Sequence, residues 1–594
     1  MSIVLGYSGL DGSREFKQRH FPGLADGEAR LYQGLDSAAA LVVDDRLVAA
    51  VQQERYSGVK FDHRFPVDAI RSCLGIAGLS INDVDEVRHN FDYGPLRVFS
   101  QGDAFSTKRF DEVYAPARQT VLLHRHFPEL SGRVDVRPVN HHHAHALTAA
   151  VPSGFDEALV VVLDGMGELH SVTVHLWRAG TLTRLAALDF RSSLGLFYAV
   201  LTLHLGYWPN SDEYKVMALA ASGDPDRFAD AMSHAIVLRA GGGFEVPLLQ
   251  LNRDPHAKET FSASREWLAA HGCPPRDGEL TQSHIDLAAA AQHRLEQALE
   301  HLVAHWADRT GVRRVAFAGG VALNCVAIGK LAASGLVDAV YVQPAAGDEG
   351  TAVGAALLGA DLSRAAQHYP RLTFLGPDVD DDRVPDDQPY FTTEIREPDA
   401  EVLAARLLST GLVVGWAQGR LEFGPRALGN RSILADPRRR EMRDRVNAAV
   451  KFREDFRPLA PAVKAECARR YFEIPDGTNM RHMTVAVPAR RDRAGEIPAV
   501  IHDDGTARVQ EVHEAEHPRM WRVLDEFERL TGVGVLMNTS LNVKGQPTAR
   551  SAAEVYRTFH LSELDIVFIG DRLYAKEWAV PEVLAALNER VEAR

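Results

Sequence analysis

The sequence predicts an α/β protein of several domains, in which buried strands end in glycine-containing loops before helices begin. Short apolar runs such as Ile3–Tyr7 and 158–163 have the length of buried strands. Each run is followed by two β-rich runs around a tight turn, so one unit occurs twice. Glycine loops at strand ends are where α/β sheets place ligands, phosphates above all.

Composition excludes several classes of protein. The chain has 594 residues, 46% of them hydrophobic, which rules out general disorder and predicts about three or four folding units. Lys and Arg total 66 against 80 Asp and Glu, so the net charge of −14 argues against a nucleic-acid partner. The four cysteines share no close spacing, so no disulfide framework is indicated. We find no long apolar run and no signal peptide, and expect a cytoplasmic protein without a membrane partner.

The first part of the chain begins with the predicted strand Ile3–Tyr7. The polar stretch 8–34 follows, and we expect it to be a surface loop. Residues Ala38–Val43 and 47–53 predict a hairpin around a polar turn. An amphipathic helix is expected to begin at Pro66.

The same order recurs later in the chain. Residues 158–163, 172–177 and 182–188 predict a strand and a hairpin, and therefore duplicated α/β halves facing each other across a cleft. A helix is expected over 285–309. The strands 314–317 and Ala339–Val342 then each lead into a glycine loop.

An aspartate-rich segment separates this part from the rest. Residues 378–388 carry six aspartates and no apolar pattern, so we predict a first domain over 1–376, a linker over 377–395 and a second domain over 396–594. In the second domain we expect a new alternation of strands and helices to begin with 403–408 and 412–416, and strands at 480–487, 533–537 and 566–570.

The histidines of residues 140–146 are the densest chemical signal. On a helix, His141 and His145 project from one face, as two imidazoles must to share a metal. The alternative is a polar helix start with incidental histidines. Asp164 and Asp348 follow strands in glycine-rich loops and offer carboxylates. Two His and two Asp suit Fe(II), Mn(II) or Zn(II), without choosing among them.

Two further sets of residues indicate phosphate chemistry. Loops containing Gly165, Gly167, Gly319 and Gly320 present backbone N–H groups suited to a nucleotide, although any one loop alone is usually a tight turn. In the second domain, arginines beside glycine and proline in 421–432 and 450–458, with hydroxyls and amides in 537–542, suit several phosphate oxygens. The alternative there is solvated helix charge.

Together these motifs resemble the O-carbamoyltransferases of the nodulation-protein and antibiotic-tailoring type. They fall in the order of that family and cover nearly the whole chain. The motifs are QER at 53–55 with Lys60, HHHAHA at 141–146, LDGMGE at 163–168, NSDEYKVMALA at 210–220, AGGVALNC at 318–325, AAGDEGTAVGAA at 345–356, EFGPRALGNRSILADPR at 422–438, KFREDFRP at 451–458 and MNTSLNVKG at 537–545.

The resemblance implies a fold and a reaction. The N-terminal domain would have the duplicated ASKHA fold of actin, sugar kinases and TsaD-like proteins, and the C-terminal domain a YrdC-like α/β fold. In such relatives the YrdC-like domain uses ATP with Mg²⁺ and carbamoyl phosphate to make carbamoyl-adenylate and pyrophosphate. The N-terminal domain then transfers the carbamoyl group to the hydroxyl of a small-molecule acceptor. The implied metal is divalent, Fe(II) before Mn(II) or Zn(II).

The resemblance also implies roles for individual residues. The implied metal ligands are His141, His145, Asp164 and Asp348. The residues implied to bind carbamoyl phosphate and ATP are Arg426, Lys451, Arg457, Arg508, Asn538 and Ser540. The residues implied to hold the adenylate at the transfer site are Lys60, Gly319, Gly320 and Asn324.

One position departs from the family pattern. Relatives usually carry His-Asp where this chain has Leu35 and Asp36. That histidine lies near the transfer centre in the family, in a position to assist deprotonation of the acceptor. Here either His20 from the longer 8–34 stretch replaces it, or transfer relies on the metal and Asp36.

Other functions fit the sequence less well. Carbamoyl transfer to tRNA is disfavoured by the net charge of −14, and transfer to a protein thiol by the lack of paired CxxC motifs. A regulatory ATPase without transfer chemistry would leave the arginine-rich motifs without a use. The acceptor itself is not readable, since antibiotics and nodulation-factor sugars both offer suitable hydroxyls.

Overall fold

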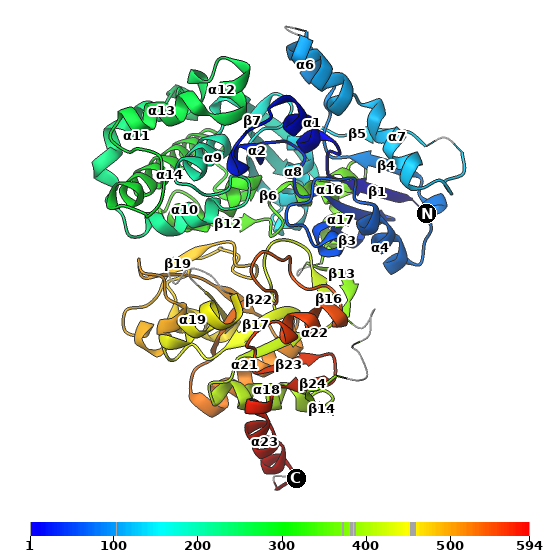
Figure 1. The fold of residues 1–594 in the computed structure, drawn as a ribbon, viewed down its shortest axis with the longest axis vertical. Helices are drawn as coiled ribbons and strands as arrows, with labels where there is room; N and C mark the ends of the chain where they lie inside the picture. Colours follow the sequence, from blue (N-terminus) through cyan, green and yellow to red (C-terminus); the bar gives the residue numbers. More distant parts are fainter. Residues whose placement is uncertain are drawn as a thin grey trace. The chain divides into compact units, whose positions relative to one another are not determined.

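The computed structural model describes residues 2–101, 104–132, 134–370, 373–379, 384, 388–451 and 459–592. They form two compact units, each of mixed α/β structure (Figure 1). The first unit comprises Met1–Glu54, Phe61–Pro370 and Asp476–Asn479, and the second Arg55–Lys60, Arg371–Pro475 and Met480–Arg594. In this described part of the chain, no helix combines the length and apolar character needed to span a membrane.

The first sheet of the first unit has the strand order β3-β2-β1-β4-β5. β1 pairs antiparallel with β2, which pairs antiparallel with β3, and on its other side β1 pairs parallel with β4, which pairs parallel with β5. The bounds are β1 (Ile3–Tyr7), β2 (Ala38–Val43), β3 (Arg46–Gln52), β4 (Glu86–His89) and β5 (Val136–Pro138).

The second sheet repeats this topology. Its order, read from the hairpin, is β8-β7-β6-β11-β12, with antiparallel pairing from β6 to β8 and parallel pairing from β6 to β12. The recurring unit in the sequence therefore corresponds to a recurring sheet. The bounds are β6 (Glu157–Leu163), β7 (His170–Arg178), β8 (Thr181–Asp189), β11 (Arg314–Ala318) and β12 (Ala339–Val342).

Two helices connect the sheets by packing against each other. α8 (His141–Ala150) lies on β6 and β11, and α16 (Asp348–Leu357) lies on β1 and β2 (Figure 1). Small residues allow the close approach: a Cβ on Gly354 would stand 2.0 Å from the carbonyl oxygen of Ala144. The remaining longer helices of this unit are α4 (Val67–Ala77), α7 (Ala117–His126), α9 (Leu194–His204), α10 (Glu213–Ala220), α13 (Ser262–Ala270), α14 (Gln282–Thr310) and α15 (Cys325–Ala333).

The second unit is built on an eight-stranded sheet. Its order is β14-β24-β23-β15-β17-β22-β18-β21, and Trp416 on β15 is fully buried. The strands are β14 (Phe391–Glu394), β15 (Val414–Ala417), β17 (Arg431–Ala435), β18 (Ala460–Lys464), β21 (Gln510–Val512), β22 (Val535–Ser540), β23 (Ile566–Ile569) and β24 (Arg572–Ala575). The longer helices are α18 (Asp399–Ser409), α21 (Pro518–Thr531), α22 (Ala552–His560) and α23 (Val580–Glu592).

The polar stretch 8–34 is not the surface loop expected from its composition. It contains α1 (Ser13–His20) and α2 (Asp26–Ala29). The Lys17 side chain is buried, and its Nζ donates to the carbonyl oxygens of Leu31 at 2.7 Å and Glu259 at 2.8 Å. Because a partner far along the chain satisfies this buried lysine, local composition was a poor guide to its burial.

Two other expectations differ from the structure. The predicted linker contains residues of paired strands. Asp378 ends β13 (Phe374–Asp378), which pairs with β16 (Arg420–Glu422), and β14 pairs with β24. Residues 380–383 and 385–387 of the predicted linker lie outside the described part. The strand expected over 480–487 is wrong except at β19 (Ala486–Pro488), which pairs with β20 (Thr506–Arg508). Met483 has a φ of 56°, which interrupts an extended backbone.

Candidate functional site

The four predicted metal ligands meet at one point in the first unit. His141 and His145 lie on α8, Asp164 follows β6 and Asp348 begins α16. Their ligand atoms all lie within 4.8 Å of one another. The Nε2 of His141 is 3.2 Å from Asp164 Oδ2 and 3.4 Å from Asp348 Oδ1, and the Nε2 of His145 is 3.6 Å from Asp348 Oδ1.

This donor set fits a divalent ion. Adjacent ligand atoms about 2.1 Å from a metal stand about 3.0–3.4 Å apart in octahedral or tetrahedral sites. The three separations of 3.2, 3.4 and 3.6 Å between histidine nitrogens and carboxylate oxygens lie close to this range. Both ring nitrogens of His145 are buried and have no hydrogen-bond partner among the described residues. A buried nitrogen without a partner is costly, and coordination would satisfy it.

The charges of the group favour a bound cation. Burial opposes protonation of His141, but Asp348 and Asp164 raise its pKa well above the usual range. Burial likewise opposes ionisation of Asp164, but the hydrogen bond from His141 and the charge of His145 lower its pKa below the usual range. Two ionised carboxylates facing buried imidazoles therefore attract positive charge, which a divalent cation can supply.

The His141 ring is oriented by a backbone carbonyl group. Its Nδ1 is 3.3 Å from the backbone carbonyl oxygen of Asn90, to which it donates as Nδ1–H. Its Nε2 shares a proton with Asp164 Oδ2 at 3.2 Å, and a bound cation would take the place of that proton. A hydrogen bond from Nδ1 to a carbonyl group is the usual support of a metal-ligating histidine.

The predicted glycine loops surround Asp164. Gly165 directly follows it, and a Cβ on Gly167 would stand 2.5 Å from Cδ2 of His142. The backbone N–H of Gly320 donates to Asp164 Oδ1 at 3.2 Å. Gly319 has a φ of +91°, and its Cβ would stand 2.2 Å from the carbonyl oxygen of Leu163, so glycine is required there.

Asn324 lies at the end of the same loop. Its Oδ1 accepts from the backbone N–H of Ala327 at 3.1 Å and caps α15. Its side-chain amide also pairs with that of Gln292 in both directions, at 2.8 and 3.0 Å. These contacts hold Asn324 close to the loop of Gly319 and Gly320.

The two candidate bases, Asp36 and His20, have different surroundings. Asp36 has a φ of 56°, and its carbonyl oxygen accepts from Ser8 Oγ at 2.9 Å. The ring of His20 stacks on Phe16 with centroids 4.1 Å apart and contacts Phe105. The contacts described for His20 thus hold it in the packing of α1, and its role in transfer stays a prediction.

Lys60 belongs to a short segment that packs with the second unit. In this segment Arg55 donates through Nη2 to the carbonyl oxygen of Gly424 at 2.9 Å, and the guanidinium of Arg550 lies over the ring of Tyr56 at 4.5 Å. The resemblance associates Lys60 with residues of the first unit, whereas its chain segment is part of the second.

Asn538 of the second unit lies next to chain segments that carry other phosphate-binding candidates. Its Nδ2 donates to Gln510 Oε1 at 2.8 Å and to the carbonyl oxygen of Ala427 at 3.2 Å, so β22 lies beside the loop of Arg426 and beside the strand that follows Arg508. Ser540 is on the same face of β22 as Asn538. Arg457 and the side chain of Lys451 lie outside the described residues.

Two buried residues that we did not single out from the sequence shape the Arg426 loop. Glu422 Oε1 accepts backbone N–H groups of Leu428, Asn430 and Arg431 at 2.8, 2.8 and 3.0 Å. The guanidinium of Arg431 is fully buried and donates to carbonyl oxygens, including that of Gln418 at 2.9 Å. The only signal in the sequence was that Glu422 and Arg431 stand, together with Arg426, in a motif rich in apolar residues and glycine.

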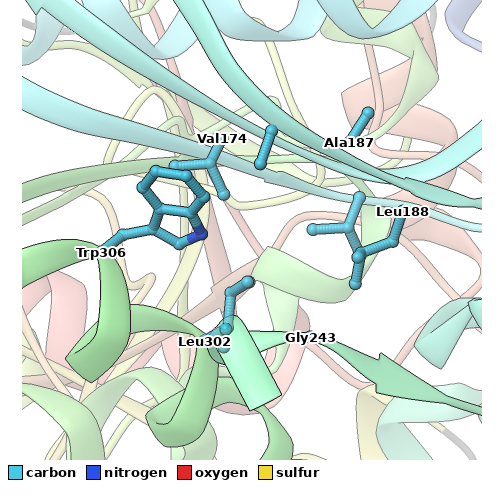
Figure 2. A pocket seen from close by; sticks show the side chains of 10 residues that line it. Val174, Ala187, Leu188, Gly243, Leu302 and Trp306 are labelled. Atoms are coloured by element: carbon cyan, nitrogen blue, oxygen red, sulfur yellow. The ribbon is translucent and has the colours of Figure 1, made fainter. Parts of the chain in front are cut away.

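An apolar hollow in the first unit is separate from the metal group. Figure 2 shows Trp306 and Leu302 of α14 facing Val174, Ala187 and Leu188. Val174 is on the face of β7 opposite Thr173, whose hydroxyl lies 3.1 Å from His142 on α8. The hollow therefore lies on the other side of the second sheet from the four ligands.

Known proteins resemble this chain along most of its length. Nodulation protein NolNO of Sinorhizobium fredii is 36% identical over 567 residues, which are 92% of this chain and 80% of that protein. The 3'-hydroxymethylcephem-O-carbamoyltransferase of Streptomyces clavuligerus is 30% identical over 373 residues, 62% of this chain and 65% of that protein. Among solved structures, component A of Acidaminococcus fermentans (R)-2-hydroxyglutaryl-CoA dehydratase is 18% identical in sequence, with a TM-score of 0.32. The match covers 62% of this chain and 100% of the chain of component A.

Two family models match the chain directly. Residues 405–576 match the carbamoyltransferase C-terminus, and residues 31–357 match the carbamoyltransferase N-terminus. The second of these matches alone spans more than half of the 594 residues. The family expected from the motifs is thereby confirmed, and the chain belongs to the carbamoyltransferase family.

Proposed function

We propose that the chain is an ATP-dependent O-carbamoyltransferase that divides two half-reactions between its two units. The second unit makes carbamoyl-adenylate from carbamoyl phosphate and ATP, and the first transfers the carbamoyl group to a hydroxyl. The observation that carries the proposal is the meeting of His141, His145, Asp164 and Asp348 in the first unit, in a chain of this family. The repeated sheet topology of that unit supports an ASKHA-like fold, and we assign a YrdC-like role to the second.

In the second unit, the proposed chemistry needs cations and fixed dipoles. Water cleaves carbamoyl phosphate to carbamate and phosphate, and a carbamate oxygen then attacks the α-phosphorus of ATP as pyrophosphate leaves. Arg426 and Arg508 neutralise phosphate oxygens, and Asn538 and Ser540 orient them by hydrogen bonds. Arg457 and Lys451 are expected to add positive charge to the same site. Mg²⁺ accompanies the ATP.

In the first unit, the four-residue group faces the transferred carbamoyl group. A divalent ion held there, Fe(II) first among the candidates, would polarise the carbonyl. The Gly165–Gly167 and Gly319–Gly320 loops, with Asn324, hold the adenylate. The acceptor oxygen bonds to the carbamoyl carbon as AMP leaves, and Asp36 receives the acceptor proton unless His20 does. Lys60 stays a proposed ligand of the adenylate phosphate.

The acceptor is a hydroxyl of a natural product in this proposal. The carbamoyltransferase of Streptomyces clavuligerus is named for a hydroxymethyl cephem, which is such a compound. A nodulation-factor-type sugar is the second candidate, because NolNO is named as a nodulation protein. The acidic net charge of −14 favours both over a tRNA acceptor.

A double variant, His141→Ala with His145→Ala, tests the division of labour. With ATP, carbamoyl phosphate and Mg²⁺, we expect it to release pyrophosphate like the wild type but to lose bound metal and carbamoyl transfer. His143→Ala, on the same helix but outside the ligand group, is the matched control. Full transfer by the double variant would overturn the metal assignment, and no pyrophosphate release by the wild type would overturn the whole proposal.

A further inference from the structure

The four ligands come from three segments of the first unit that are separated in the sequence. α8 carries two histidines, the loop after β6 carries Asp164 and the first turn of α16 carries Asp348. A fourth segment, residues 90–92 after β4, lies among them without contributing a ligand. Hydrogen bonds connect this segment to all three, because Asn90 bonds to His141 of α8 and to Thr351 of α16, and Asp92 bonds to Glu168 in the loop after β6.

Asn90 connects α8 to α16. Its carbonyl oxygen accepts from His141 Nδ1 at 3.3 Å, and its side-chain Nδ2 donates to Thr351 Oγ1 at 2.7 Å. The Thr351 hydroxyl in turn donates to the backbone carbonyl of Asp348. Asn90 is 4% exposed and Thr351 is fully buried, so water does not compete for these bonds. These hydrogen bonds connect the segment after β4 to Asp348, which supplies a ligand.

Glu168 connects the loop after β6 to α8. Its Oε1 accepts the backbone N–H of His141 at 2.7 Å and that of Asp92 at 3.1 Å. Its Oε2 accepts from Asn140 Nδ2 at 2.6 Å, and Asn140 Oδ1 caps α8 by accepting from the N–H of His143 at 3.0 Å. A carboxylate at the start of a helix is also favoured by the helix dipole.

We propose that Asn90, Thr351 and Glu168 are positioning residues of the metal group. They set the distances between α8, the Asp164 loop and α16, so that four ligands from separate segments present one coordination shell. Outer partners of this kind hold ligand orientation, and their loss typically weakens metal binding by about 10- to 100-fold. The inference rests on the proposed function only in requiring that the group binds a metal.

Thr351 offers the cleanest test. Thr351→Val keeps the branched shape inside α16 and removes the hydroxyl, whereas Thr351→Ser keeps the hydroxyl. Titration of the metal-free full-length protein with Mn²⁺, followed by electron paramagnetic resonance, should show binding weakened by about 10- to 100-fold in the valine variant. The serine variant should bind within about threefold of the wild type, because it retains the bond to Asp348.

Thr202→Val is the matched control for loss of a buried threonine hydroxyl. Thr202 is fully buried in α9, and its Oγ1 donates to the carbonyl oxygen of Tyr198 at 2.9 Å. We expect this variant to lose stability without losing Mn²⁺ affinity. Pyrophosphate release, assigned to the other unit, should stay at the wild-type rate in all three variants.

Glu168→Gln is a second test should Thr351→Val fail to fold. Glutamine keeps the size of the side chain but places a donor opposite Asn140, so we expect Mn²⁺ affinity to fall by about tenfold in a protein that still folds by circular dichroism. Wild-type Mn²⁺ affinity in a folded Thr351→Val or Glu168→Gln protein would overturn the positioning role alone. Absence of Mn²⁺ binding by the wild type would overturn the metal assignment as well.

Discussion

Replacing Gly319 with alanine places a methyl group where the loop after β11 passes the end of β6. Gly319 has a φ of 91° and a ψ of 154°, a backbone region open almost only to glycine. The new Cβ would stand 2.2 Å from the carbonyl oxygen of Leu163 and 2.6 Å from its carbonyl carbon. Because carbon contacts are favourable only near 3.5–4.0 Å, the two backbones must separate by about 1 Å.

The structure allows the size of this effect to be worked out. The glycine-only conformation costs about 1–3 kcal/mol for alanine, and the forced separation of packed backbone about the same again, so we expect a loss of about 2–6 kcal/mol in stability. Asp164 directly follows Leu163 and accepts from Gly320 N–H at 3.2 Å. Since metal sites tolerate about 0.2 Å in ligand distance, a shift of about 1 Å should lower metal affinity by at least about tenfold.

Thermal unfolding and Mn²⁺ titration of the Gly319→Ala protein measure the two effects. Gly311→Ala is the control, because Gly311 also has a positive φ, 71°, but its Cβ would meet open space. It should lose only the left-handed contribution, about 1–2 kcal/mol, and keep its metal affinity. If Gly319→Ala unfolds like Gly311→Ala and binds Mn²⁺ like the wild type, the proposed packing of this loop against Asp164 is refuted.

Three further outcomes are expected. Ser540→Ala should slow pyrophosphate release by about 10- to 100-fold, and carbamoyl transfer from supplied carbamoyl-adenylate should stay unchanged; equal loss of both would indicate one shared site. Both polar atoms of the Gln33 side-chain amide, in the 8–34 stretch, are buried without a hydrogen-bond partner among the described residues. The Gln33→Leu variant should therefore keep the melting temperature of the wild type. A raised KM for the acceptor in this variant would assign the 8–34 stretch to the acceptor site. Burial lowers the pKa of His204 in the folded protein to about 4, below the value of about 6.5 in the unfolded chain. The unfolded chain therefore binds a proton at this histidine first, and the stability present above about pH 6.5 is lost as the pH falls towards 4. His204→Gln should therefore reduce the loss of stability between pH 7 and pH 5 by about 2 kcal/mol, as measured by denaturant unfolding at both pH values.

Much of the secondary structure was predictable because each element carries its own periodic pattern. The bounds predicted for Ile3–Tyr7, Ala38–Val43 and Ala339–Val342 match β1, β2 and β12, since continuous apolar runs between polar turns are typical of buried strands. The predictions failed where a distant partner outweighed local composition. α1 is held by the bonds of Lys17 to residues 31 and 259, and the left-handed Met483 breaks a run that reads as a strand.

The sequence by itself determined which residues have the chemistry for the metal group. A spacing of four places His141 and His145 on one helical face, and glycine loops after strands pointed to Asp164 and Asp348. Only the tertiary structure decided that these residues meet, that Asn90 and Glu168 support them and that Lys60 packs with the second unit. The physical reason is that helix and strand periodicity acts over a few residues. The approach of α8 to α16 depends instead on the packing of small side chains, such as Gly354 against Ala144, from distant parts of the chain.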